Sequence, residues 1–319
     1  MTLSRDTPVA IVGAGLMGVA IGYVFAAGGH DVTLYDPNDD VRASALGRAA
    51  AVATLLDEDG AASLAHLAIE GELAGAVATA GLVIEAGPES LEVKREIFLE
   101  LERLTGPSVV LATNTSGIPI RDIAEPLRDA FRVVGTHFWN PPYLVPLVEV
   151  VGSESTSDEF VTETVELLAS VGLRPVRLRA DIPGFVGNRM QHALKREAIA
   201  LVAAGVCDAE TVDTVVKYGF GLRLGVLGPL EQSDLIGLEL TLAIHETLMP
   251  ALDVTAVAHP LLVQLVAEGK TGAARGEGFR KWTPDQAAAL QSKVNEYLVE
   301  AAQRRRRDDR DETLAKGAP

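Results

Sequence analysis

The stretch VAIVGAGLMG, residues 9–18, decides the fold because it joins a buried strand to a glycine turn and the start of a helix. Its glycines are Gly13, Gly15 and Gly18, in the spacing GxGxxG. The first permits a tight turn, the second lets a pyrophosphate approach the backbone, and the third lets helix and strand pack closely. The helix N-terminus then offers amides to the phosphates. The stretch predicts a dinucleotide site, and a glycine turn that binds nothing is the alternative.

The next predicted strand, DVTLYD at 31–36, ends in the acid that such a site needs. Asp36 follows the glycines by about 20 residues, where a carboxylate accepts hydrogen bonds from the adenosine ribose and repels a 2′-phosphate. No arginine follows it closely, so we expect NAD as the cofactor in preference to NADP. Leu16 and Met17, inside the glycine motif, are also predicted to bind the cofactor.

Short apolar runs alternate with helical segments through the first half of the chain, at 9–15, 31–36, 81–86, 108–114 and 131–138. This pattern is typical of a parallel sheet covered on both faces. After Pro183, apolar residues recur at helical spacing, and Asp208 is the expected N-cap of one helix. We therefore predict an α/β fold: a Rossmann-type doubly wound sheet in 1–183, an all-helical domain in 184–300, and a disordered charged tail in 301–319.

Composition excludes several classes of partner. The formal net charge is −16 and the pI is about 4.8, so nucleic acid and anionic membrane surfaces would be repelled. No apolar run is long enough to cross a bilayer, and the N-terminus does not look like a signal peptide. Cys207 is the single cysteine, which excludes an internal disulfide and fits a reducing compartment. We expect a cytoplasmic protein with a small-molecule substrate and no metal site.

The segment GTHFWNPPYLVPLVEVV, residues 135–151, places His137 and Glu149 in apolar surroundings. Taken alone, the histidine is typical of a hydrogen-bonded core residue and the glutamate of an exposed strand edge. A strand, a Pro-Pro turn and a returning strand would bring the two together, and a buried carboxylate needs such a partner. The arrangement favours a general base whose imidazolium is stabilised by a neighbouring carboxylate.

The chain resembles the 3-hydroxyacyl-CoA dehydrogenase family and its relatives that act on free hydroxy acids. The resemblance runs to about residue 285. It rests on GAGLMG, EAGPESLEVK, ATNTSGIPI, GTHFWNPP with EVV, DIPGFVGNR and GPLEQSDLIGL. It implies a homodimer formed through the helical domain.

The resemblance also implies roles for individual residues. His137 matches the general base and Glu149 its orienting partner. Ser116 and Asn188 match the positions that hydrogen-bond the reacting oxygen. The remaining cofactor positions implied are Glu89, Lys94 and Asn114. Three of these residues also have ordinary alternatives: Ser116 bonding a turn amide, Asn188 capping its helix, and Lys94 lying on a helix surface.

The substrate class is read from departures from the CoA-using enzymes. Residues 39–76 contain no lysine and only Arg42 and Arg48 against seven acids, an unfavourable place for a polyanion such as CoA. The segment YGFGLRLGVLGPLE brings in Arg223, whose guanidinium suits a free carboxylate, although an ion pair with Glu231 is the alternative. This segment resembles relatives acting on gulonate and carnitine, and other stretches resemble one acting on a formyl-hydroxy-pyridine carboxylate.

We therefore expect a small hydroxy carboxylate as the substrate, with an L-3-hydroxyacyl-CoA as the alternative. A third reading is a crystallin-like protein that binds NAD without turnover. Such a protein has no need of the base or its partner, and both His137 and Glu149 are present.

Overall fold

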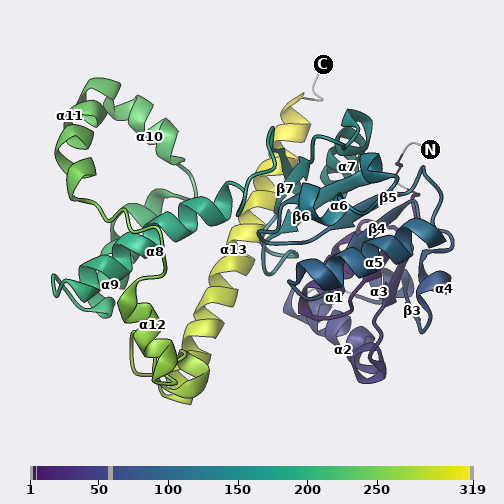
Figure 1. The fold of residues 1–319 in the computed structure, drawn as a ribbon, viewed down its shortest axis with the longest axis horizontal. Coiled ribbons are helices and arrows are strands. Elements are labelled where there is room, and N and C mark those ends of the chain that lie inside the picture. The colour runs from purple at the N-terminus through teal and green to yellow at the C-terminus, as the bar shows by residue number, and fades with distance from the viewer. Residues whose placement is uncertain (1–2, 5, 57–59, 317–319) are drawn as a thin grey trace. The chain divides into compact units, whose positions relative to one another are not determined.

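The computed structural model describes residues 3–4, 6–56 and 60–316. The chain divides into two compact units. The first comprises Met1–Asn188 with Tyr297–Pro319, and the second comprises Arg189–Glu296. Figure 1 shows a twisted sheet flanked by helices in the first unit and helices alone in the second. The predicted α/β fold followed by an all-helical region is confirmed.

The first unit is built on one eight-stranded sheet in the order β3-β2-β1-β4-β5-β6-β7-β8. The strands are β1 Val9–Val12, β2 Val32–Tyr35, β3 Leu67–Glu70, β4 Leu82–Glu85, β5 Val110–Thr113, β6 Val133–Phe138, β7 Leu147–Gly152 and β8 Arg174–Arg177. Neighbours are parallel except β6 and β7, which are antiparallel. β1 lies between β2 and β4. Because these three strands are parallel, their carboxyl ends lie at the same edge of the sheet.

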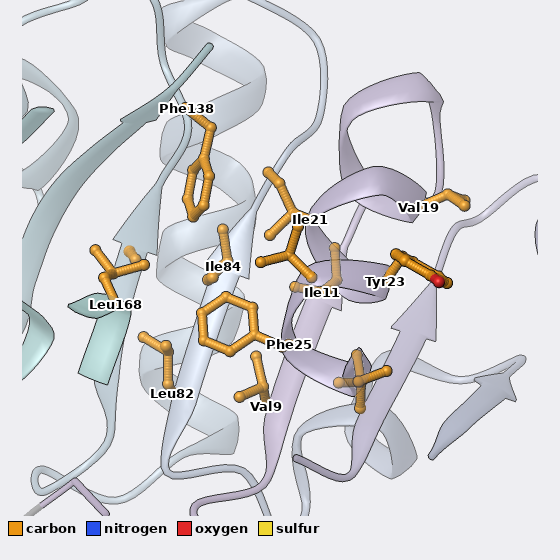
Figure 2. Packing of buried hydrophobic residues seen from close by; sticks show 14 of the residues in the cluster. Val9, Ile11, Val19, Ile21, Tyr23, Phe25, Leu82, Ile84, Phe138 and Leu168 are labelled. Carbon is orange, nitrogen blue, oxygen red and sulfur yellow. The ribbon is translucent and has the colours of Figure 1, made fainter. Parts of the chain in front are cut away.

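Helices cover both faces of this sheet. They are α1 Leu16–Ala27, α2 Asp39–Leu55, α3 Ala61–Ala65, α4 Leu73–Val77, α5 Leu91–Leu104, α6 Ile120–Ala124, the short η1 Ala130–Arg132, and α7 Asp158–Ser170. Successive strand residues point to opposite faces, so each strand supplies two cores. Val9 and Ile11 pack with Phe25 of α1 on one face, as Figure 2 shows. Val83 and Phe98 belong to the cluster on the other face.

The second unit contains helices only. They are α8 Gly187–Ala203, whose start lies in the first unit, α9 Ala209–Tyr218, η2 Phe220–Arg223, α10 Pro229–Ile236, α11 Leu238–Leu248, η3 Met249–Ala251, α12 Pro260–Ala267, η4 Ala273–Arg275 and the beginning of α13 Pro284–Lys316. The Asp208 carboxylate accepts a 2.8 Å hydrogen bond from the Thr211 amide, so the predicted N-cap is confirmed. No residue from 189 to 296 is buried.

The prediction of a disordered tail is wrong for residues 301–316, which continue helix α13. Within the first unit this part of the helix is packed and hydrogen-bonded: Ala302 is buried, and the Arg305 guanidinium donates to the Leu144 carbonyl oxygen at 3.4 Å. Opposite charges one turn apart also suit a helix, as in the Arg304–Asp308 pair at 4.0 Å. Residues 317–319 lie outside the described residues.

The division between the units falls after Asn188, later than the boundary at 183 that the sequence suggests. The difference has a local cause. The amides of Val186 and Gly187 both donate to Glu149 on β7, which ties the start of α8 to the sheet. Within the described residues, no helix is long and apolar enough to cross a membrane.

Candidate active site

The glycine loop forms a tight turn between β1 and α1. Gly13 has φ of +104°, and a Cβ there would lie 2.7 Å from the Ala86 carbonyl oxygen. A Cβ on Gly18 would lie 1.7 Å from the Gly13 oxygen. Both positions therefore require glycine. Gly15 is different, because nothing lies within 4 Å of the place its Cβ would take. That open side, beside the first turn of α1, leaves room for a ligand phosphate near the helix N-terminus.

The two other residues of the loop have different surroundings. Leu16 is 70% exposed at the start of α1, whereas Met17 is partly buried and packs against the core cluster of β1 and α1. Met17 thus supports the loop from behind, and Leu16 borders its open side.

Asp36 follows β2 at the same edge of the sheet. Its carboxylate accepts a 3.0 Å hydrogen bond from the Ala14 amide and another of 3.0 Å from the Asn38 amide. The side chain therefore joins the glycine loop to the start of α2. A carboxylate oxygen accepts more than one hydrogen bond, so Asp36 keeps acceptor capacity for a ribose hydroxyl.

A buried ion pair lies at the carboxyl end of β4. The Lys94 ammonium donates to both oxygens of Glu85, at 2.8 and 2.9 Å, and the two side chains are 1% and 0% exposed. Thr113 and the Gly87 amide also donate to Glu85, each at 2.7 Å. The ordinary alternative for Lys94, a helix-surface charge, is wrong. Its partner Glu85 was not picked out from the sequence.

Glu89 extends this pair toward β5. One of its oxygens lies 3.6 Å from the Lys94 nitrogen, and the other accepts from the Thr115 hydroxyl at 2.6 Å and the Ser116 amide at 2.9 Å. Glu89 and Lys94 are thus brought together, as the resemblance implies. Glu89 is about half exposed, in contrast to the fully buried Glu85.

Asn114, Ser116 and Asn188 gather just beyond β5. The Asn114 side-chain oxygen accepts from the Phe138 amide at 3.0 Å, which holds β5 and β6 together at their ends. The Asn188 side-chain amide donates to the Ser116 carbonyl oxygen at 2.8 Å. Asn188 therefore does not cap its helix through this group. Turn amides are bonded by Thr115 instead of Ser116, because the Thr115 hydroxyl accepts from Gly117 and Ile118.

His137 and Glu149 stand opposite one another on the antiparallel strands β6 and β7. Residues paired in this register place their side chains on the same face. His137 Nδ1 lies 2.9 Å from Glu149 Oε2, and both side chains are buried. The expected contact is present. It leaves Nε2 as the imidazole nitrogen that does not face the carboxylate.

Glu149 has a second set of partners at its other oxygen. Oε1 accepts hydrogen bonds from the Val186 and Gly187 amides, at 2.9 and 3.0 Å. Burial by itself raises the pKa of Glu149, but the hydrogen bonds from His137, Gly187 and Val186 together outweigh it and hold the pKa below its ordinary value. Glu149 is therefore an ionised carboxylate beside His137 at neutral pH.

Two aromatic rings flank the imidazole. The Trp139 and Phe185 ring centroids lie 5.4 and 5.6 Å from that of His137. Phe185 is fully buried, with φ of +49°, and a Cβ on Gly187 would lie 2.3 Å from the Trp139 ring. The rings fix the plane of the imidazole and limit the access of water to it.

The glycine loop, Asp36 and the buried His137–Glu149 pair all lie at the ends of strands in one sheet. The open side at Gly15 and the acceptor at Asp36 fit a dinucleotide. The model of the 3-hydroxyacyl-CoA dehydrogenase NAD-binding domain matches residues 8–182, and that of the 3-hydroxyacyl-CoA dehydrogenase C-terminal domain matches residues 184–282.

The chain belongs to the 3-hydroxyacyl-CoA dehydrogenase family.

Members similar to it include dehydrogenases with different substrates. It is 34% identical over 295 residues to 5-formyl-3-hydroxy-2-methylpyridine 4-carboxylate 5-dehydrogenase of Mesorhizobium japonicum, covering 91% of this chain and 96% of that one. It is 39% identical over 232 residues to L-carnitine dehydrogenase of Streptomyces coelicolor, covering 72% and 73%. A solved structure of a 5-formyl-3-hydroxy-2-methylpyridine 4-carboxylic acid 5-dehydrogenase, described as an NAD⁺-dependent dismutase, matches with a TM-score of 0.88 and 33% identity, covering 92% and 97%.

This family member is an NAD-dependent dehydrogenase acting on hydroxyl groups. The residue predicted to bind the substrate carboxylate, Arg223, lies outside this group. Arg223 is exposed on η2 of the second unit. Among the described residues no ion pair joins it to Glu231, whose carboxylate instead accepts from the Gly228 amide at 2.7 Å. The ordinary alternative for Arg223 is therefore not observed.

Proposed function

We propose that this dehydrogenase oxidises the hydroxyl-bearing carbon of a small hydroxy carboxylate, with His137 as general base. The observation that carries the proposal is the buried 2.9 Å contact between His137 Nδ1 and Glu149. The carboxylate keeps the Nδ1 proton in place, so the Nε2 lone pair accepts the proton of a substrate hydroxyl. Glu149 then stabilises the imidazolium.

Bound NAD supplies the hydride acceptor for the same carbon. Ser116 and Asn188 act on the reacting oxygen. The contacts at Ser116 use its amide and carbonyl groups, and its exposed hydroxyl serves as a donor to the substrate oxygen. Asn188 is steadied by its bond to the Ser116 carbonyl. Donors held in this way polarise a carbonyl in the reverse reaction.

The cofactor is held by residues along the strand ends. Gly13, Gly15 and Gly18, with Leu16 and Met17 between them, cradle the pyrophosphate at the start of α1. Asp36 accepts hydrogen bonds from the adenosine ribose.

Glu89, Lys94 and Asn114 bind the nicotinamide half of the cofactor. Glu85 positions the Lys94 ammonium by accepting hydrogen bonds from it at both carboxylate oxygens. Asn114 fixes the spacing of the ends of β5 and β6, because its side-chain oxygen bonds the Phe138 amide.

The preference for a substrate with a free carboxylate, over a CoA thioester, rests on the positions of the arginine side chains. The segment 39–76 contains Arg42 and Arg48 as its only arginines, and both are used within the chain. Arg42 bonds the Asp36 carbonyl and the Asp39 carboxylate. Arg48 donates to the carbonyls of Ala14 and Val41, at 2.6 and 3.0 Å. Neither guanidinium is available to a CoA phosphate, whereas exposed Arg223 is available to a carboxylate.

A comparison of substrates tests this choice. Acetoacetyl-CoA and a panel of free hydroxy acids are assayed at equal NAD(H), with NADH absorbance as the readout. We expect turnover of a free hydroxy acid and little of the thioester. A kcat/KM for the thioester above about 10⁴ M⁻¹s⁻¹, within the ordinary enzyme range, favours the L-3-hydroxyacyl-CoA alternative. NADH binding without turnover of any substrate would favour the crystallin-like one.

The dehydrogenase is further proposed to be a cytoplasmic homodimer. The compartment suits a chain with one cysteine, Cys207. The dimer is supported by the second unit, whose large apolar side chains stand open: Tyr218, Leu222, Val226 and Leu230 are 77–82% exposed. Apolar surface on this scale marks an interaction site, and a second copy supplies an equal apolar surface to cover it.

Sedimentation velocity measures the assembly directly. We expect twice the chain mass for the wild type and a shift toward the monomer for Leu230→Glu. The matched control is Leu46→Glu, an exposed leucine on α2 of the first unit, which leaves the mass unchanged. A monomeric wild type at micromolar concentration contradicts the dimer.

A further inference from the structure

The adenosine end of the cofactor site contains a cation that the cofactor assignment does not use. Arg42 lies on the first turn of α2, and its side chain is only 19% exposed. One end of its guanidinium donates to the Asp36 carbonyl oxygen at 2.5 Å, and the other bonds the carboxylate of Asp39. The guanidinium is thus within hydrogen-bond reach of the residue that accepts the ribose.

The charges around this guanidinium are predominantly acidic. Asp36 faces the glycine loop, and Asp39 and Asp40 open helix α2, whose N-terminus is already capped by the Asn38 side chain. Asp39 is 89% exposed, and among the described contacts its side chain bonds only Arg42. A 2′-phosphate at the ribose would meet Asp36 directly, with Arg42 neutralised beside it. Phosphate carries nearly two negative charges at neutral pH, so this arrangement repels it.

We propose that two carboxylates together set the selectivity for NAD over NADP. The Asp36 carboxylate faces the adenosine ribose and repels a 2′-phosphate. The Asp39 carboxylate holds the Arg42 guanidinium, which is otherwise able to bind a 2′-phosphate. Arg42 is then a latent ligand for the phosphate ester of the NADP ribose. Its planar fork suits phosphate oxygens because two parallel N–H donors meet two acceptors. The proposal rests on the proposed role of Asp36 at the ribose.

The two carboxylates contribute unequally. Asp36 excludes the phosphate by occupying its place with a like charge, which is the larger effect. Asp39 and Arg42 form an exposed pair between residues three apart on a helix, and such pairs are weak. Removing Asp39 alone therefore frees Arg42 but leaves the repulsion from Asp36. Only the double change converts the site.

The experiment measures the dissociation constants of NADH and NADPH by cofactor fluorescence, without substrate, so the readout does not depend on turnover. Asp36→Ser is expected to weaken NADH binding and tighten NADPH binding, each about tenfold or more, because a ribose acceptor and a repulsive charge are lost together. Adding Asp39→Asn tightens NADPH a further few-fold. Arg42→Met in that double variant then weakens NADPH on the order of ten- to a hundredfold, the range for a charge-assisted hydrogen bond.

The control is Arg103→Met in the same double variant. Arg103 is an exposed arginine on α5 whose described partner is Glu100, so its loss removes equal charge away from the site. Circular dichroism confirms that each variant is folded. The single variant Asp39→Asn, changed at an exposed position, measures the effect of the Asp39–Arg42 pair separately. We expect it to tighten NADPH binding about twofold.

The outcomes separate the two assignments. If Arg42→Met leaves the NADPH constant of the double variant within twofold, Arg42 is not the phosphate ligand and the proposal fails, while the role of Asp36 stands. If Asp36→Ser changes neither NADH nor NADPH binding, Asp36 is not at the ribose, and both assignments fail. A loss of NADPH binding with Arg103→Met as large as that with Arg42→Met would indicate a general charge effect and overturn the proposal as well.

Discussion

In the first unit Lys94 and Glu85 face each other at 1% and 0% exposure, while in the second unit Tyr218 and Leu230 stand 80% and 79% exposed. One region places charges in its interior, and the other leaves apolar side chains outside. The buried charges are costly unless they are fully paired, so their positions are determined by the surrounding sheet. The open apolar helices have no such internal constraint. The reacting groups are therefore expected to depend on the first unit, and assembly and substrate binding on the second.

The strongest way to test this division is to remove the base from the first unit. His137→Ala is expected to lower kcat by about 10²- to 10⁴-fold, because proton removal from the hydroxyl loses its acceptor. Stopped-flow measurement of NADH formation reports the loss, and NADH fluorescence should show nearly unchanged cofactor affinity. The matched variant is His245→Ala, an exposed histidine in α11 of the second unit, with kcat unchanged. Equal rates for His137→Ala and the wild type would rule out the base assignment.

The next effect concerns stability. Glu85→Ala leaves the buried Lys94 with only the longer 3.6 Å contact to half-exposed Glu89, and breaking a buried pair in this way costs about 3–5 kcal/mol. Urea unfolding at pH 7 measures the change in free energy. Glu100→Ala on α5 removes a carboxylate from an exposed pair with Arg103, where about 0–1 kcal/mol is expected. Similar losses for the two variants would mean that burial does not distinguish these pairs.

A smaller change is expected for the charge in the second unit. Under the proposed role of Arg223 as a carboxylate ligand, Arg223→Met should raise KM for the substrate about ten- to a hundredfold and leave kcat nearly unchanged. Lys217→Met removes an exposed charge from the same unit and serves as the control. A fall in kcat with unchanged KM would instead assign Arg223 to the chemistry and blur the division between the units.

The smallest effect is a dependence of stability on pH. The pKa of Glu149 is lowered in the folded protein, since burial, which raises it, is outweighed by the bonds from His137, Gly187 and Val186. The ionised carboxylate therefore stabilises the fold above its ordinary pKa of 4.5, and this contribution is lost as the pH falls through the lowered value. Urea unfolding between pH 6 and pH 3 should show a steeper loss for the wild type than for Glu149→Gln. Parallel curves would contradict the assignment.

Much of the first unit was predictable from its sequence because local pattern and tertiary structure agree. Strands β1, β2 and β4 to β7 were found, as were the glycine loop and the contact of His137 with Glu149 on a returning strand. The edge strands β3 and β8 were missed. β8 reads RPVR, with charges and a proline that an outer strand tolerates, and β3 reads LAIE, with one buried residue.

Other features depend on long-range contacts that no local pattern reports. Glu85 meets Lys94 only because α5 folds back over the end of β4. A charged residue ending the apolar strand LVIE was the available signal. Trp139 and Phe185 come from distant segments, and their contact with His137 follows from packing. The length of the last helix depends on packing too: the charge of residues 301–319 suggests a disordered tail, whereas Ala302 is buried in the first unit.

Glu149 limits how the sequence can change over time. The two oxygens of Glu149 serve different neighbours, His137 on one side and the start of α8 on the other. A substitution at this position is therefore exposed to selection twice, once through the proton chemistry and once through the helix by which the chain leaves the sheet. A descendant that abandoned catalysis would still be under pressure to keep an acceptor there. A chain that has lost the histidine but kept this glutamate would then show common ancestry and the need for the helix contact. The glutamate alone would not indicate catalytic activity.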